Sequence, residues 1–283
     1  MSIPYFLSFI HWRMNPDIFN FQGFALHYYS LMFAFAFMSG YVILLQIFRR
    51  ENIDEKLLGH LLIYMVIATL AGARLGDCFF YDWGYYRHHL LEIILPVEFE
   101  PGGKVNFIGY RGLASHGGAI GIIIACVLYC RMYKVNFLWL MDRLCIVVAL
   151  AGMFIRLGNL FNSEIIGTPT NVPWAFIFER VDMMPRHPSQ LYEAFCYLII
   201  FIVLYKVYLK KYNRQNGLLF GIFLVAVFTA RFVIEFWKQD QEMFEQNMPL
   251  NMGQLLSIPF VITGIILIYL KSKWQNSEAT ISD

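Results

Sequence analysis

Charged residues are scarce in this chain of 283 residues. Only 15% are Asp, Glu, Lys or Arg, whereas 58% are hydrophobic and the mean hydropathy is +0.53. Soluble domains carry about 25% charged residues, so this shortage indicates an integral membrane protein. The formal net charge of +2 gives no indication of a nucleic-acid partner, and we expect none.

Other signals are missing as well. The five cysteines include no CxxC pair and all fall in apolar runs, which favours buried thiols over disulfides or metal ligands. Neither HExxH nor a Gly-rich nucleotide loop occurs, so we expect no metal and no other cofactor. Residues 1–23 lack the continuous apolar core of a cleaved signal peptide, which predicts a short segment on the membrane surface.

Long apolar runs are what the chain does contain. About 20 apolar residues cross a bilayer as a helix, and the alternating pattern of a membrane β-barrel is absent. The sequence therefore predicts an all-α, polytopic bundle of about seven spans that forms one membrane domain over residues 1–283, with outward loops that carry short helices. The expected spans are residues 25–48, 57–81, 115–132, 138–155, 191–208, 218–237 and 252–270.

Basic residues gather in the short linkers after the first, third and fifth spans and in the C-terminal tail. Lys and Arg flank cytoplasmic ends of membrane helices. This distribution predicts a cytoplasmic C-terminus. It also predicts an outer N-terminus, and outer positions for the two long loops at about 82–114 and 156–190.

With this topology, polar side chains of six spans fall near the outer surface. Three of them are arginines, Arg74, Arg156 and Arg231, accompanied by His116. Ionisable groups inside a membrane cost about 2.5–3.5 kcal/mol each, so their shared depth predicts a cavity that opens toward the outer leaflet. Because a guanidinium suits a phosphate group, the expected ligand is a phospholipid.

Local spacings suggest how these groups are arranged. Arg231 and Glu235 are four residues apart, which predicts an ion pair on one helix face. Gly-xxx-Gly spacings in residues 72–76 and 117–121 predict close helix packing. Asp142 and Arg143 are expected to reach the inner membrane surface.

Three other classes of membrane protein are weaker alternatives. A phospholipid transporter or flippase would favour polar sites at the bilayer midplane and inverted repeats, and no repeat is apparent. An intramembrane protease would need a nucleophile or metal set that is not found here. A receptor-like seven-helix bundle leaves the arginines at the outer edge unexplained.

The polar stretches also resemble, in order, those of the bacterial prolipoprotein diacylglyceryl transferases. The strongest is RLGNLFNSEIIG, residues 156–167, and the likeness extends over nearly the whole chain. The chain departs from the family pattern at Ile155, Thr168 and Val227, where glycine, arginine and tyrosine are common. The other similar stretches are residues 25–32, 72–81, 115–121, 186–194, 230–239 and 252–259.

The resemblance implies transfer of the diacylglyceryl group of phosphatidylglycerol to the lipobox cysteine of a prolipoprotein signal peptide. The reaction would lie at the outer face of the bacterial cytoplasmic membrane, with the lipid bilayer as surroundings. The expected catalytic residues are His116 as base, with Arg156 and Arg231 on the phosphate. The expected substrate-binding residues are Tyr29, Arg74, Asn159, Glu164, Gly167 and Glu235.

Overall fold

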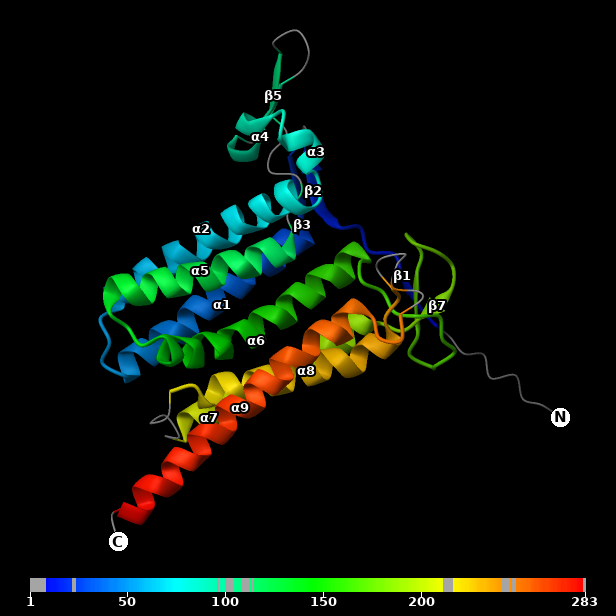
Figure 1. Cartoon of the computed structure of the whole chain (residues 1–283). Coiled ribbons are helices and arrows are strands. Elements are labelled where there is room, and N and C mark those ends of the chain that lie inside the picture. Colours follow the sequence, from blue (N-terminus) through cyan, green and yellow to red (C-terminus); the bar gives the residue numbers. More distant parts are fainter. Residues whose placement is uncertain are drawn as a thin grey trace, which may run out of the picture. The chain divides into compact units, whose positions relative to one another are not determined.

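The fold is known from a computed structural model, which describes residues 9–21, 24–95, 97–99, 104–107, 112, 114–210, 216–240, 245 and 248–281. Within this part of the chain, seven helices are long and apolar enough to cross a membrane. The predicted all-α, multi-pass class is therefore confirmed. These helices, drawn in Figure 1, are α1 (Tyr28–Arg50), α2 (Glu55–Phe80), α5 (Ser115–Tyr133), α6 (Phe137–Asn162), α7 (Ser189–Leu209), α8 (Leu218–Ile234) and α9 (Met252–Ile281).

Two helix boundaries differ from the prediction in ways that matter for the site. The fourth span was expected to end at residue 155, but α6 has 26 residues and continues to Asn162. Arg156 and Asn159 therefore lie on a helix rather than after one. The first span begins at Tyr28 instead of residue 25, because Phe24–His27 forms strand β3 and pairs with β2 (Asp17–Phe21).

The chain forms two compact units, one of Met1–Leu44 with Met141–Asp283 and the other of Leu45–Leu140. In the first unit α8 packs against both α7 and α9, and in the second α2 packs along α5 (Figure 1). The expectation of a single membrane domain stays a prediction.

Glycines bring α2 and α5 together. A Cβ atom added at Gly76 would lie only 2.6 Å from the Cα atom of Gly117, and one added at Gly72 would lie 3.0 Å from the Cα atom of Gly121. Only residues without side chains allow the two backbones to approach this closely. The close packing predicted from the two Gly-xxx-Gly spacings is thus confirmed.

The expectation that Asp142 and Arg143 reach the membrane surface is wrong. Both side chains are buried, with 2% of each residue exposed. The Asp142 carboxylate accepts hydrogen bonds from the backbone N–H groups of Gly217 and Phe220, at 2.7 and 2.8 Å. Asp142 therefore caps the N-terminus of α8 from a neighbouring helix and satisfies two donors that the helix itself leaves unpaired.

The segments between the spans contain both short helices and short strands. The segment after α2 contains α3 (Trp83–Tyr86), α4 (Leu90–Ile94) and a hairpin of β4 (Val97–Phe99) and β5 (Val105–Phe107), so the expected short helices are present there. The segment between α6 and α7 contains strands instead, β6 (Phe176–Phe178) and β7 (Pro185–Arg186). Near the N-terminus, β1 (Ile10–Trp12) pairs in parallel with β6, and this pairing ties residues predicted only as a surface segment to the first unit.

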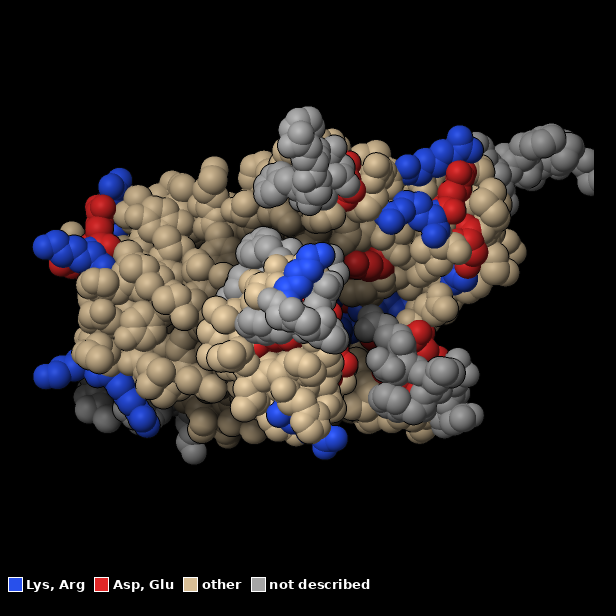
Figure 2. Space-filling view, turned by 90° about the horizontal axis from the view of Figure 1, so that it is seen from above, with Lys and Arg blue, Asp and Glu red and all other residues tan. Residues whose placement is uncertain are grey.

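The surface is largely apolar, as lipid surroundings require. Met38 on α1 and Ile67 on α2 are 65% and 61% exposed, and uncharged residues cover most of the face in Figure 2. The five cysteines are free thiols, as expected, but only four are buried, because Cys196 is partly exposed.

Candidate active site

Arg156 is held from two sides in the first unit. Its Nε atom forms an ion pair with the Glu193 carboxylate of α7, and its Nη1 atom donates a hydrogen bond to the Asn159 side-chain oxygen at 3.0 Å. Arg156 and Asn159 are three residues apart on α6 and so share one helix face. The guanidinium is thereby fixed in orientation before any ligand binds.

The end of α6 explains the spacing of the residues that follow Arg156. The helix closes in a Schellman motif, in which Glu164 N–H bonds to the Asn159 carbonyl and Ser163 N–H bonds to the Leu160 carbonyl. This motif places residues five apart in sequence side by side. The Asn159 amide accordingly donates to the Glu164 carboxylate at 3.2 Å, and Asn162 donates to its second oxygen at 3.1 Å.

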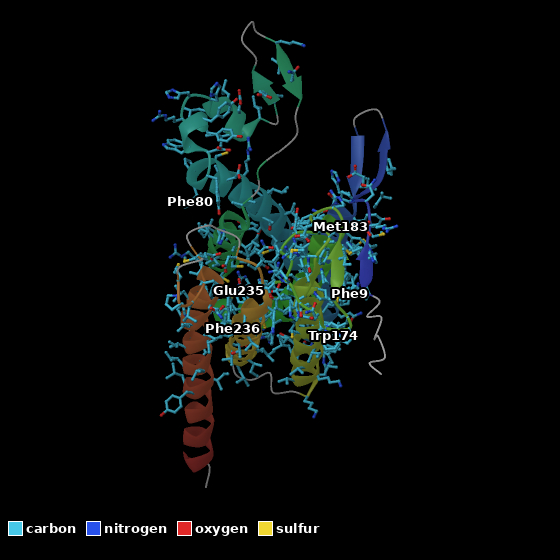
Figure 3. All side chains as sticks on the ribbon, turned by 90° about the vertical axis from the view of Figure 1, so that its right-hand side faces the viewer. Phe9, Phe80, Trp174, Met183, Glu235 and Phe236 are labelled. Atoms are coloured by element: carbon cyan, nitrogen blue, oxygen red, sulfur yellow. The ribbon has the colours of Figure 1, made fainter. Side chains whose placement is uncertain are left out.

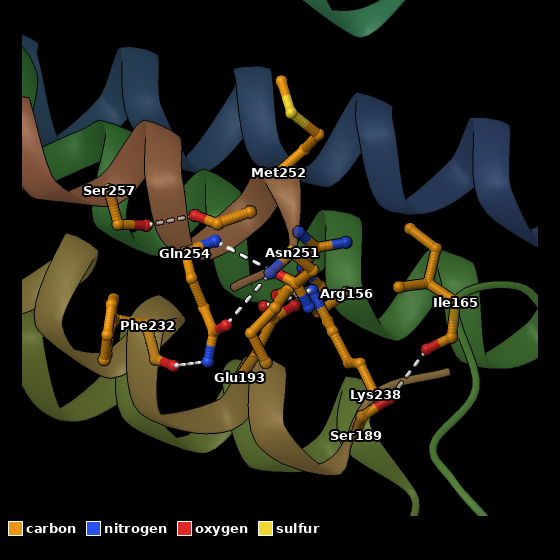
Figure 4. Close-up of polar contacts among 12 residues, drawn as sticks. Arg156, Ile165, Ser189, Glu193, Phe232, Lys238, Asn251, Met252, Gln254 and Ser257 are labelled. Atoms are coloured by element: carbon orange, nitrogen blue, oxygen red, sulfur yellow. Dashed lines mark hydrogen bonds and ion pairs between the residues drawn. The ribbon is translucent and has the colours of Figure 1, made fainter. Parts of the chain in front are cut away.

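A buried chain of opposite charges continues from Arg156 (Figure 4). Glu193, fully buried, bridges Arg156 and Lys238, whose Nζ atom lies 2.9 Å from Glu193 and 2.9 Å from Glu235. Neither Glu193 oxygen receives a hydrogen bond of regular geometry from a described residue, so these ion pairs alone compensate its charge.

Glu235 therefore has a different partner from the one predicted. Its carboxylate pairs with Lys238 instead of Arg231, because the last turn of α8 tightens into a 3₁₀ helix (Glu235–Trp237) that brings residues three apart together. Glu235 is consequently buried whereas its neighbour Phe236 is 60% exposed; Figure 3 labels both.

Arg231 is half-buried and makes no side-chain hydrogen bond or ion pair with the described residues. Like Arg156, it lies near enough to Tyr197 for electrostatic interaction. An arginine so placed inside a membrane protein keeps all its donors for an anion.

Gly167 and Tyr29 have steric roles. A Cβ atom at Gly167 would lie 2.5 Å from the His187 side chain and 2.6 Å from the Trp237 carbonyl oxygen, so only glycine fits there. The Gly167 N–H also donates to the His187 carbonyl at 3.0 Å. The Tyr29 ring of α1 packs over Gly158, which lies between Arg156 and Asn159 in the sequence.

The loop after α6 is tied down by a second arginine, Arg186. Its guanidinium binds the Asp182 carboxylate, and its Nη1 atom donates to the Gly167 carbonyl and to Gln239, at 3.2 and 3.0 Å. Hydrogen bonds from the Arg186 guanidinium hold the pKa of Asp182 below its usual value, while burial lowers the pKa of His187. These contacts fasten the loop to the segment that carries Lys238.

Arg74 and His116 belong to the second unit. Arg74 is buried, and its guanidinium donates to the backbone carbonyls of Glu92 and Ile93 at 2.7 and 3.3 Å and lies over the Tyr86 ring. These bonds fasten α4 to α2. His116 lies in the first turn of α5, as expected, and is exposed.

The sequence prediction did not select Glu193 or Lys238 as site residues. Glu193 lies in the RHPSQLYE stretch, one of the motifs already noted, and Lys238 follows Glu235 by three residues. An i, i+3 pair of opposite charges at the end of an apolar helix was an available signal. That both residues meet Arg156 depends on the packing of three helices, which no spacing reveals.

Seven apolar helices and a buried charge network define the class, a multi-pass membrane protein, and Arg231, which has no partner among the described residues, makes an anionic group the expected ligand. The chain belongs to the prolipoprotein diacylglyceryl transferase family, whose sequence model matches residues 16–270. This family consists of transferases, so the predictions of an enzyme and of this family are confirmed, and nothing favours a flippase.

Relatives cover nearly the entire chain. A phosphatidylglycerol–prolipoprotein diacylglyceryl transferase of Bacteroides fragilis is 51% identical over 93% of this chain and 96% of its own length. Proteins of the same name from Chloroherpeton thalassium and Tolumonas auensis are 44% and 43% identical, over 96% and 93% of this chain and 98% of each relative.

Proposed function

We propose that this chain transfers the diacylglyceryl group of phosphatidylglycerol to the lipobox cysteine of a prolipoprotein signal peptide. The products are a thioether-linked diacylglycerol and glycerol phosphate, and the step is the first of lipoprotein maturation. The names of the relatives support the two substrates. The observation that carries the proposal is the pair of arginines, one fixed by Glu193 and Asn159 and the other without a partner among the described residues.

In the proposed reaction, the cysteine sulfur attacks the glycerol carbon that is bonded to the phosphate oxygen. A C–S bond forms and the C–O bond breaks, so negative charge grows on the departing phosphate. Arg156 and Arg231 stabilise that charge. The thiol must first lose its proton, because a thiol with an ordinary pKa near 8.5 is only slightly ionised at neutral pH.

His116 is the proposed acceptor of this proton. It is exposed at the start of α5, and a neutral imidazole can take a proton at physiological pH. His116→Gln keeps a polar side chain but removes the base, so we expect a loss of about 10²–10⁴ in kcat. Near-normal turnover by the variant would overturn this assignment and leave His116 a positional role.

The reaction is proposed to occur at the outer leaflet of a bacterial cytoplasmic membrane. The basic linkers support an outer N-terminus and a cytoplasmic C-terminus. The signal peptide, itself an apolar helix, would enter laterally from the bilayer.

The proposal is tested with purified protein in liposomes that contain phosphatidylglycerol and a peptide with a lipobox cysteine. Mass spectrometry should detect a diacylglyceryl mass on the cysteine. A peptide with serine at that position and liposomes of phosphatidylethanolamine alone serve as controls. If folded protein leaves the cysteine peptide unmodified with phosphatidylglycerol present, the proposal is wrong, and the departures at Ile155, Thr168 and Val227 would mark a changed activity.

A further inference from the structure

Two left-handed residues flank Glu164 in the loop that follows α6. Ser163 has a φ of 57° and Ile165 a φ of 56°. Serine at the first position closes the Schellman motif, where glycine is usual. Ile165 is the more unusual case, because a β-branched side chain strongly disfavours positive φ. Such a conformation persists only where surrounding contacts enforce it.

The first turn of α7 supplies those contacts. Ser189 donates its hydroxyl to the Ile165 carbonyl at 2.7 Å, and Gln190 donates its side-chain amide to the Glu164 carbonyl at 2.7 Å. Both side chains are fully buried, and Figure 4 shows the Ser189 bond to Ile165. The two donors therefore hold the carbonyl groups of the two peptide bonds that flank the Cα atom of the left-handed Ile165.

The fixed backbone of this loop places the Glu164 carboxylate beside Asn159. While the backbone of this loop is fixed, the exposed Glu164 carboxylate accepts from the Asn159 amide, and the Asn159 oxygen accepts from Arg156. A relaxed Ile165 would turn the Glu164 carbonyl away from Gln190 and shift the Glu164 carboxylate relative to the Asn159 amide, even though the Glu164 N–H keeps its bond to the Asn159 carbonyl. Arg156 would then keep its Glu193 pair and its interaction with Tyr197, while its hydrogen-bond partner Asn159 would be held less firmly.

We propose that Ser189 and Gln190 are positioning residues that hold the left-handed backbone at Ile165 and thereby orient Arg156 through Glu164 and Asn159. This inference rests on the proposed function, since it assigns Arg156 to the phosphate. The two residues form a latch, the name used below for Ser189 and Gln190 together. The latch acts on the transition state through Arg156, so its loss lowers kcat and leaves the KM for phosphatidylglycerol nearly unchanged.

The test removes the latch donors in two backgrounds. Gln190→Met and Ser189→Ala delete the hydrogen bonds with little change of shape, and we expect each to lower kcat by about tenfold, the effect of one lost contact of about 1.4 kcal/mol. The second background carries Ile165→Asn, with Ile165→Gly as an alternative, because both residues adopt positive φ at low cost. In that background the loop keeps its conformation unaided, so latch removal should lower kcat by less than about threefold.

Ser257→Ala is the matched control. Ser257 is also fully buried and donates to a backbone carbonyl, that of Gly253, at 2.6 Å, but it lies within α9. Its removal should leave kcat unchanged. Equal losses of kcat in the native and Ile165→Asn backgrounds would overturn the latch, because a purely space-filling role gives additive effects. An unchanged kcat in both backgrounds would overturn it as well.

Hydrogen exchange gives a measurement that does not need the reaction. Amide exchange of a peptide covering residues 157–168 should accelerate in the latch variants and slow again with Ile165→Asn. Unchanged exchange in Gln190→Met and Ser189→Ala would also overturn the latch. If the native chain modifies no peptide but the exchange pattern appears, the proposed function fails and the latch stands as a device of the loop.

Discussion

Three arginines of this chain carry the same guanidinium group but have different surroundings. The Arg156 guanidinium is bound by Glu193 and Asn159, the Arg74 guanidinium by backbone carbonyls, and Arg231 has no partner among the described residues. Of these three guanidinium groups, that of Arg231 has all five donors unbonded to the described residues, which makes it the one most available to a ligand. The structure thus separates three arginines that the sequence presented as equivalent.

Arg231→Lys tests the anion-binding role. Lysine keeps the positive charge but cannot form the two parallel hydrogen bonds that a guanidinium makes with phosphate. We expect kcat for diacylglyceryl transfer to fall by about 10²–10³, with unchanged thermal unfolding. Arg180→Lys, in the loop between α6 and α7, is the matched control. Full activity of Arg231→Lys would exclude a bidentate clamp.

Lys238 tests the buried charge network. Replacing it by methionine leaves Glu235 and one side of Glu193 without a counter-charge, both of them buried. Removing one partner of a buried ion pair costs about 3–5 kcal/mol of the free energy of unfolding. We therefore expect Lys238→Met to unfold at a clearly lower temperature in detergent, while Lys238→Arg remains close to the native protein. Equal unfolding temperatures for native and Lys238→Met protein would contradict the network.

At the scale of elements, two neighbouring glycines of α5 provide a sharp comparison. A Cβ atom at Gly117 would lie 2.6 Å from the Cα atom of Gly76 on α2, whereas one at Gly118 would make an ordinary contact of 3.6 Å with Ala73. Gly117→Ala should lower the free energy of unfolding by about 1–3 kcal/mol through overpacking, measured in detergent. Gly118→Ala should be neutral or stabilising, and similar losses for both variants would show that the α2–α5 contact does not limit stability.

At the scale of the whole molecule, the orientation of the seven spans is a prediction from charge alone. Lys104 lies in the segment between α2 and α5, and Lys134 follows α5 directly; both are exposed. In intact cells, a membrane-impermeant maleimide should label Lys104→Cys and spare Lys134→Cys, with the parent chain as control for its own thiols. The opposite pattern of labelling would invert the topology and move the proposed reaction to the cytoplasmic leaflet.

Much of this protein follows from local sequence. A membrane-spanning helix pairs its backbone polar groups within itself and needs only an apolar run of sufficient length. The apolar length of each run was therefore enough to predict seven spans. Close packing of α2 and α5 followed from glycines four residues apart. The motif containing Arg156, Asn159 and Glu164 indicated the family, and its internal spacing is that of one helix end, which is again local.

Contacts between separate elements could be decided only by the tertiary structure. The spacing of Arg231 and Glu235 predicted an ion pair, yet Lys238, buried after the 3₁₀ turn and paired with Glu193 of α7, gave Glu235 another partner. Asp142 was expected at a membrane surface, but α8 begins against it. A buried charge takes whichever counter-charge or donor the packing brings within reach, and that choice depends on residues far apart in the chain.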